Sequence, residues 1–159
     1  MHRKKWKAGL GIGVVLLVVI GVSAVFFRSK PMIEPTDHPQ ISFISATVEQ
    51  QGKTYDCDVP EGELPEEVKD ALIALFLRTE IRNTLFPPPQ TYTVSDDSVF
   101  ICVKVQLDNA ALYMNLCSHS DYNSAQFGDT HYDIVDHQTL YQDVYPLLSD
   151  VISTHMVER

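Results

Sequence analysis

Three cysteines are the most reactive side chains of this chain, and their number is odd. Cys57 falls on the apolar face of a predicted hairpin, where an unpaired cysteine behaves as a small hydrophobic residue. Cys102 and Cys117 fall opposite each other on the outward face of a second predicted hairpin. A cross-strand disulfide between them is possible in an oxidising compartment. The sequence contains no C-x-x-C, so a thioredoxin-type redox site has no support.

Histidine, cysteine and aspartate side chains crowd the segment from Cys117 to His137. They supply the atoms that bind zinc, and the candidate ligands are His119, Asp121, Asp129 and His131. The segment lacks a helical H-x-x-x-H and a paired cysteine motif. An EF-hand starting at Asp129 lacks glycine at its sixth position and glutamate at its twelfth. The alternative is a polar loop followed by a helix cap at Asp136, and we predict no cofactor.

The motifs of nucleophilic catalysis are missing. G-x-S-x-G does not occur, and no glycine-rich loop could hold a phosphate. Cys117 and His119 stand two apart on a predicted strand and so share a face, but no third residue completes a catalytic site. We therefore do not predict an enzyme. A thiol- or metal-dependent activity at Cys102, Cys117 and His119 stays as the alternative.

Two predicted hairpins and two predicted helices must position these residues. The first hairpin joins 41–50 to 53–59 through Gln51-Gly52, and it pairs Val48 with Tyr55, Ala46 with Cys57 and Ile44 with Val59. The second joins 99–107 to 112–119, and it pairs Val105 with Met114, Val103 with Leu116 and Cys102 with Cys117.

Helical spacing of apolar residues predicts one helix from Leu64 to about Asn83 and another from Asp136 to about His155. Residues 120–130 are expected to form a loop, and 131–135 a short edge strand. The sequence therefore predicts an α+β fold. It consists of an antiparallel sheet of four to five strands with two helices (β-β-α-β-β-(β)-α) plus an N-terminal transmembrane helix.

The first 40 residues predict a membrane anchor. Residues 1–7 form a basic tail, 8–27 carry no charge, and 28–40 form a proline-containing spacer before the domain at 41–159. Twenty apolar residues make about 30 Å of helix, which matches a bilayer core. The excess of cations before this segment predicts a single-pass protein of the cell membrane with a cytoplasmic N-terminus and an extracellular domain. The alternative is a signal peptide cleaved near Ala24, which would release a secreted form.

Charge and aromatic content limit the partners. All 21 acidic residues lie in 31–159, together with only six lysines and arginines. Such a domain repels nucleic acid and attracts cations or basic partners. Aromatic residues concentrate in the C-terminal third, and an exposed contact surface could include Tyr113, Tyr122, Phe127 and Tyr132.

The chain resembles the uncharacterised small extracytoplasmic domains of Gram-positive bacteria of the clostridial type. The residues that carry this resemblance are Gly52-Lys53-Thr54-Tyr55, Tyr92 and Leu140-Tyr141, and it covers about 41–150. It implies a membrane-anchored α+β domain and implies no activity. We therefore expect a membrane-tethered extracytoplasmic binding module of unknown ligand, whose partner is a membrane or cell-envelope protein.

Overall fold

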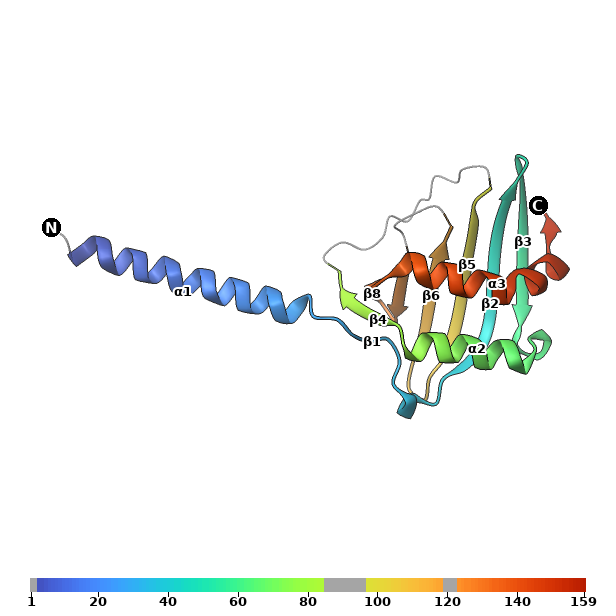
Figure 1. Cartoon of the computed structure of the whole chain (residues 1–159), viewed down its shortest axis with the longest axis horizontal. Coiled ribbons are helices and arrows are strands. Elements are labelled where there is room, and N and C mark those ends of the chain that lie inside the picture. Colours follow the sequence, from blue (N-terminus) through green and yellow to red (C-terminus); the bar gives the residue numbers. More distant parts are fainter. Residues whose placement is uncertain (1–2, 85–96, 119–122) are drawn as a thin grey trace.

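The computed structural model describes residues 3–84, 97–118 and 123–159, with the backbone alone for 3–13 and 137. These residues form one nine-stranded antiparallel sheet, and helices α2 and α3 lie on one of its faces (Figure 1). The strand order is β1-β4-β8-β7-β6-β5-β2-β3-β9. The strands are β1 Lys30–Pro31, β2 Gln40–Gln50, β3 Lys53–Pro60, β4 Glu80–Asn83, β5 Val99–Gln106, β6 Ala111–Cys117, β7 Ser124–Phe127, β8 Thr130–Ile134 and β9 Val157–Glu158. The helices are α1 Arg3–Phe26, α2 Glu66–Leu77 and α3 His137–His155, with the short 3-10 helices η1 Pro35–Asp37 and η2 Glu61–Glu63.

The predicted sheet of four to five strands with two helices is wrong, because the described part of the chain forms nine strands and three α-helices. The sequence pattern predicts none of β1, β4, β7 and β9. Each of these strands has at most four residues, which is too short for an alternation of apolar and polar residues to be recognised. The separation of helices from antiparallel strands is consistent with an α+β fold.

The predicted transmembrane anchor over 8–27 is also corrected. Within the described residues, no helix combines the length and the apolar character needed to cross a membrane. The structure therefore does not support a signal anchor, a single-pass membrane protein or the orientation derived from it.

The first predicted hairpin is confirmed in detail. Strands β2 and β3 pair Val48 with Tyr55, Ala46 with Cys57 and Ile44 with Val59. The two-residue turn has positive φ at both central positions, 54° at Gln51 and 72° at Gly52. That combination defines a type I′ turn, whose twist suits adjacent antiparallel strands and favours glycine.

A β-bulge at Ser42 interrupts the alternation of β2 and explains why Ile41 is buried although it is three residues from the buried Ile44. Strand β2 pairs with β5 through Ile41–Val105 and Phe43–Lys104, so Ser42 is an extra residue on one strand. The bulge turns Ile41 toward the helices, where it is 1% exposed. Phe43 then points to the opposite face and remains half-buried.

The register predicted for the second hairpin is wrong by two residues. The turn centres on Asp108-Asn109, where the Leu107 amide donates to the Ala110 carbonyl at 2.8 Å. Val103 therefore pairs with Met114, and Cys102 pairs with Asn115. A shift of two residues keeps every side chain on its predicted face, because side chains alternate with a period of two.

The predicted helix from Leu64 to Asn83 divides into two elements. Helix α2 ends at Leu77, and β4 follows two residues later and pairs with β1 and β8. Thr79 lies between the two elements. Its hydroxyl donates to the Leu75 carbonyl at 2.9 Å, one of the carbonyls of the last turn of α2. The proline cluster at 87–89 lies outside the described residues.

Between the second hairpin and the last helix, the structure differs from the prediction. The predicted loop over 120–130 contains β7, and the predicted edge strand is the interior strand β8, which pairs with β7 and β4. The helix predicted from Asp136 to His155 is confirmed as α3, and Pro146 lies inside it.

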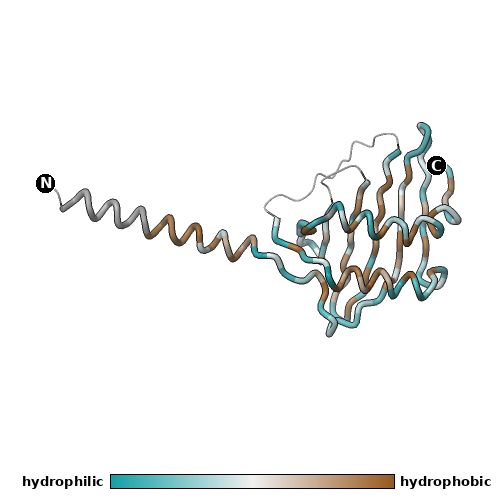
Figure 2. Tube along the Cα trace, in the orientation of Figure 1, coloured by the Kyte–Doolittle hydropathy of each residue, from teal (hydrophilic) through white to brown (hydrophobic). Residues whose placement is uncertain are grey.

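One continuous core lies between the sheet and helices α2 and α3, and hydrophobic residues recur along the strands and helices that border it (Figure 2). Alternate strand residues and the inner stripes of the helices supply it. Met32 and Ile33, which belong to the segment expected to be a spacer, are also buried there, at 4% and 1% exposure. The fully buried side chains include Ile44, Val59, Leu72, Phe76, Val103, Leu112, Met114, Val144 and Leu148.

The bulge can be tested by deleting single residues from β2. Deletion of Ser42 restores a regular strand without changing any face, and it removes only the weak bond from Ser42 to the Lys104 carbonyl. We expect it to lower the free energy of unfolding by about 1 kcal/mol. Deletion of Ser45, the matched control, moves Ile44 and Ile41 to the opposite face and should cost roughly 3–6 kcal/mol. Urea unfolding measures both, and equal losses would contradict the bulge.

His155 ties the last turn of α3 to η2. Its Nδ1 lies 2.8 Å from the Val151 carbonyl oxygen, and its Nε2 lies 2.8 Å from a carboxylate oxygen of Glu63. Both partners only accept hydrogen bonds, so both ring nitrogens carry a proton in this geometry. The bond to Val151 and then the bond to Glu63 raise the pKa of His155 above its usual value of 6.5.

This pair predicts a loss of stability as the pH rises. The folded state binds the His155 proton more tightly than the unfolded state, so the contribution is complete below pH 6.5 and disappears as the pH passes the folded pKa. His38, bonded to Asp108 at 2.8 Å, acts in the same direction. Urea unfolding measured between pH 5.5 and about 8.5 gives the free energy of unfolding at each pH. Over this range, that free energy should decline less for His155→Gln than for the unmodified protein. Parallel declines would show that His155 does not contribute.

Candidate functional site

The face of the sheet opposite α2 and α3 is the larger candidate surface. One row of polar side chains crosses seven strands by direct pairing, from β3 through β2, β5, β6, β7 and β8 to β4. Its members are Asp58, Ser45, Cys102, Asn115, Ser124, Asp133 and Arg82. We call this surface the open face, because no described helix or strand covers it (Figure 1).

A second row on the open face mixes aromatic and polar side chains. It contains Pro60, Phe43, Lys104, Tyr113, Gln126 and His131. The Lys104 ammonium lies 5.7 Å from the centre of the Tyr113 ring, within the range of a cation–π contact. Tyr113 is 37% exposed, the most of any aromatic residue in the described sheet. A partly exposed tyrosine ring is suited to contact another protein.

Two polar atoms on the open face are buried and lack a hydrogen-bond partner, Ser124 Oγ and His131 Nδ1. Asp133, which lies opposite Ser124 in the sheet, does have a partner, because Arg82 Nε donates to its Oδ2 at 3.4 Å. The Ser124 hydroxyl, the imidazole and the Asp133 carboxylate form no hydrogen-bonded relay with one another. They therefore do not form a catalytic triad, whose members must be within hydrogen-bond reach.

The four aromatic residues expected to form one surface do not share a face. Tyr113 lies on the open face, and Tyr122 lies outside the described residues. Phe127 and Tyr132 lie on the helix side of the sheet and pack edge to face, with ring centres 5.8 Å apart. The Lys30 ammonium lies 4.5 Å from the centre of the Tyr132 ring.

The predicted metal ligands are only partly described. His119 and Asp121 lie outside the described residues. Asp129 is exposed in the turn between β7 and β8, and His131 is on the open face. Among the residues with defined positions, no three histidine, cysteine or acidic side chains are close enough to hold a metal ion.

All three cysteines are free thiols. Cys102 and Cys117 are not direct partners, because Cys102 lies opposite Asn115 and Cys117 lies opposite Phe100. Burial raises the pKa of Cys102, and burial together with the nearby Asp58 raises the pKa of Cys57 to about 11. A raised pKa disfavours the reactive thiolate. These environments are those of structural cysteines.

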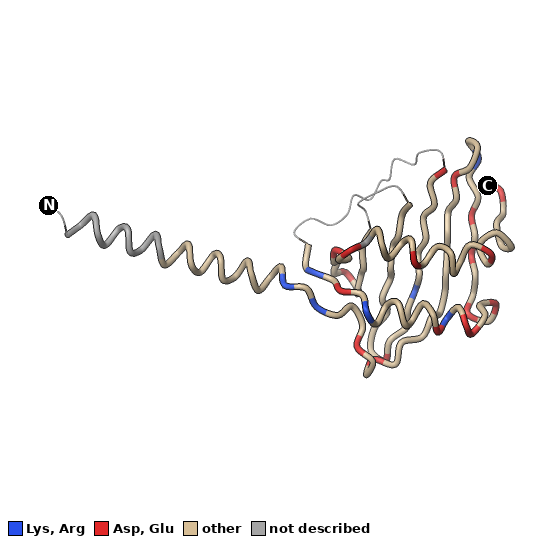
Figure 3. The backbone as a smooth tube through the Cα atoms, viewed as in Figure 1, with Lys and Arg blue, Asp and Glu red and all other residues tan. Residues whose placement is uncertain are grey.

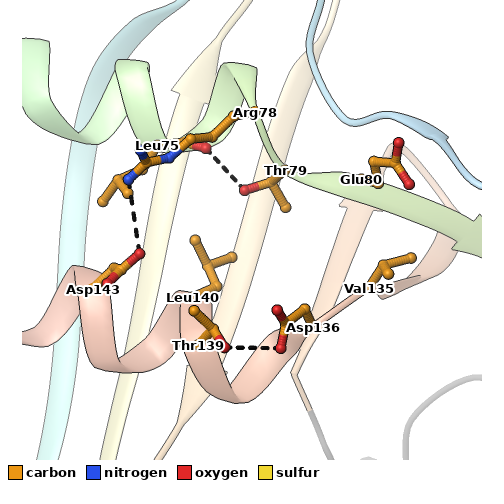
Figure 4. Close-up of a pocket in the computed structure, with 9 residues that line it drawn as sticks. All are labelled: Leu75, Arg78, Thr79, Glu80, Val135, Asp136, Thr139, Leu140 and Asp143. Atoms are coloured by element: carbon orange, nitrogen blue, oxygen red, sulfur yellow. Dashed lines mark hydrogen bonds and ion pairs between the residues drawn. The ribbon is translucent and has the colours of Figure 1, made fainter.

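A cleft of about 260 Å³ lies between the end of α2 and the start of α3 (Figure 4). Arg78 reaches across it to Asp143, with 3.7 Å between Nη2 and Oδ2. The Thr139 hydroxyl donates to Asp136 Oδ1 at 2.8 Å. The carboxylates of Glu80, Asp136 and Asp143 outnumber the single guanidinium, which would favour binding of a cationic group. However, Asp143 is already paired with Arg78, and Asp136 accepts a bond from Thr139. The lining residues are Leu75, Arg78, Thr79, Glu80, Val135, Asp136, Thr139, Leu140 and Asp143.

Comparison of the chain with known protein families, curated proteins and solved structures found no match. The function must therefore be inferred from the residues of this chain alone.

The register of β5 and β6 predicts where a disulfide can form. Bonded and non-bonded residue pairs alternate along an antiparallel ladder. Leu107 and Ala110 are a hydrogen-bonded pair, so 105–112, 103–114 and 101–116 are bonded too. The pair between the last two, Cys102 and Asn115, is therefore non-hydrogen-bonded. Cβ atoms of such pairs are close enough for a disulfide. In air-oxidised protein, Asn115→Cys should leave two free thiols, Cys57 and Cys117, and the unmodified protein should keep three. Four free thiols in the variant, or one in the unmodified protein, would contradict this register.

Proposed function

We propose that this protein is an interaction module that binds a protein partner through the open face of its sheet. The observation that carries the proposal is the packing of both described domain helices, α2 and α3, on the same face of the sheet. Helices α2 and α3 cover one face of the sheet, and on the other face an exposed tyrosine stands beside a lysine within two rows of polar and aromatic side chains. Tyrosine at such positions contributes strongly to protein interfaces.

The charge of the domain indicates what the partner carries. Acidic residues outnumber basic ones on the strands, helices and connections (Figure 3). On and beside the open face, Glu49, Asp56 and Asp58 line its β2–β3 end, and Lys104 stands near the middle. A partner with basic groups opposite β2 and β3 would be attracted over several ångströms, and this attraction would weaken in salt.

A thiol- or metal-dependent activity receives no support from the described residues. The two cysteines of that hypothesis lie on different rows of the open face, and burial raises the pKa of Cys102. His119, its third residue, lies outside the described part of the chain. We therefore propose binding alone.

The proposal is tested by photo-crosslinking in the cells that produce the protein. A photoreactive phenylalanine analogue replaces Tyr113 on the open face or, as a matched control, the exposed Gln142 on the outer side of α3. We expect a discrete adduct from position 113 and none from position 142. An adduct from both positions, or from neither, would contradict the open face as the binding surface.

Point variants should then measure the contribution of the face. With the crosslinked partner purified, Tyr113→Ala should weaken binding by about tenfold, since central aromatic residues of interfaces often contribute more than 1 kcal/mol. Gln142→Ala should leave binding unchanged. An unchanged affinity for Tyr113→Ala would contradict the proposed contact.

A further inference from the structure

Strand β3 lies at one end of the sheet, and its outer edge is only partly paired. Strand β3 has eight residues, and β9 pairs with just two of them, Tyr55 and Asp56. One further bond joins the Arg159 amide to the Thr54 carbonyl at 2.9 Å. Within the described residues, no strand lies beside 57–60 on this side. An incompletely paired edge can accept another strand.

The backbone groups on this edge follow from the ladder. Thr54 and Arg159 form a hydrogen-bonded pair, so by alternation Asp56 and Val157 form the next one. The following outward-facing backbone groups are those of Asp58, whose N–H and C=O point away from β2. An added strand longer than β9 would therefore reach a donor and an acceptor that β9 leaves unpaired.

The side chains along the edge favour a basic strand. Asp56 already binds Arg159, with 2.7 Å between Asp56 Oδ2 and Arg159 Nη2. Asp58 lies on the same face of β3 two residues away, is exposed, and has no ion-pair partner in the described part of the chain. Arg159 of the chain's own C-terminal segment thus pairs with Asp56, one of the two carboxylates, and leaves Asp58 without a cationic partner among the described residues. A strand with basic residues at alternate positions would fill both.

The contacts that hold β9 are weak ones. Its two ion pairs, Lys53–Glu158 and Arg159–Asp56, join side chains that are 40% to 69% exposed, and exposed pairs contribute little. Val157 is 68% exposed and packs little apolar surface. A competing strand that forms the same bonds and adds the pair at Asp58 can therefore replace β9.

We propose that the outer edge of β3 is a strand-addition site for an extended peptide segment with basic residues at alternate positions, and that β9 is its intramolecular occupant. Recognition would combine main-chain hydrogen bonds to Thr54, Asp56 and Asp58 with ion pairs to the two carboxylates. Asp56 and Asp58 also line the β2–β3 end of the open face, but the main-chain groups of this site lie on the outer edge of β3, so loss of main-chain pairing distinguishes the two sites.

The test uses the full chain and a fluorescent seven-residue peptide that alternates arginine with valine, capped at both ends. Fluorescence anisotropy measures its affinity for the unmodified protein and for Val157→Pro, which removes the β9 amide that bonds to Asp56. We expect Val157→Pro to bind the peptide at least about threefold more tightly, because the competing strand is weakened. If circular dichroism shows that this variant is unfolded, Arg159→Ala replaces it.

Three controls separate strand addition from charge attraction. The same peptide with its arginine amides N-methylated keeps its charge but cannot pair with β3, so it should lose binding. Asp58→Asn should weaken binding by about threefold or more, and Asp150→Asn, an exposed acid on α3, should not. Addition of the peptide should also slow hydrogen exchange at the Asp58 amide.

Several results would overturn the proposal. One is equal binding of the N-methylated peptide. Another is no binding of the alternating peptide at 1 mM by either the unmodified protein or the β9 variant. Binding that Tyr113→Ala abolishes and Asp58→Asn leaves intact would move the peptide to the open face and overturn the edge site alone.

Discussion

The structure depends on the burial of one face of a wide antiparallel sheet by two amphipathic helices. Every interior strand presents alternate apolar residues to this layer, and α2 and α3 return Leu72, Phe76, Val144 and Leu148 to it. Helix α2 connects β3 to β4, and α3 connects β8 to β9, so each helix crosses between the two ends of the sheet. This crossing brings strands that are distant in sequence into one core, and among the described elements it places both helices on the same face of the sheet.

The faces of the strands could be predicted from the sequence more reliably than their pairing. Alternation in 44–59 and 99–117 assigned side chains correctly to the buried or outward face. The Asp108-Asn109 turn lies one residue before the expected centre, which moves each partner by two and preserves the faces. The disulfide geometry expected for Cys102 and Cys117 failed for this reason, since a bond depends on the partner as well as the face.

The short strands and the candidate sites could not be predicted, because they depend on contacts between distant segments. Strand β4 has four residues and is stabilised by β1 and β8 on its two sides, a fact that no local pattern contains. The cleft at Arg78 and Asp143 exists only because the end of α2 meets the start of α3. Of the open face, Tyr113 was predicted as an exposed contact residue. The bulge at Ser42, which turns Ile41 into the core, has no counterpart in the local pattern.

The positions of the two shortest strands also determine how the domain would respond to mechanical load. Strands β1 and β9 lie at opposite ends of the sheet, and each is joined to its neighbour through two residue pairs. Tension applied between them acts across the strands, so it opens hydrogen bonds one after another instead of shearing many at once. The outer strands would detach at low force, while the β2–β5–β6 centre, with its longer ladders, would remain folded.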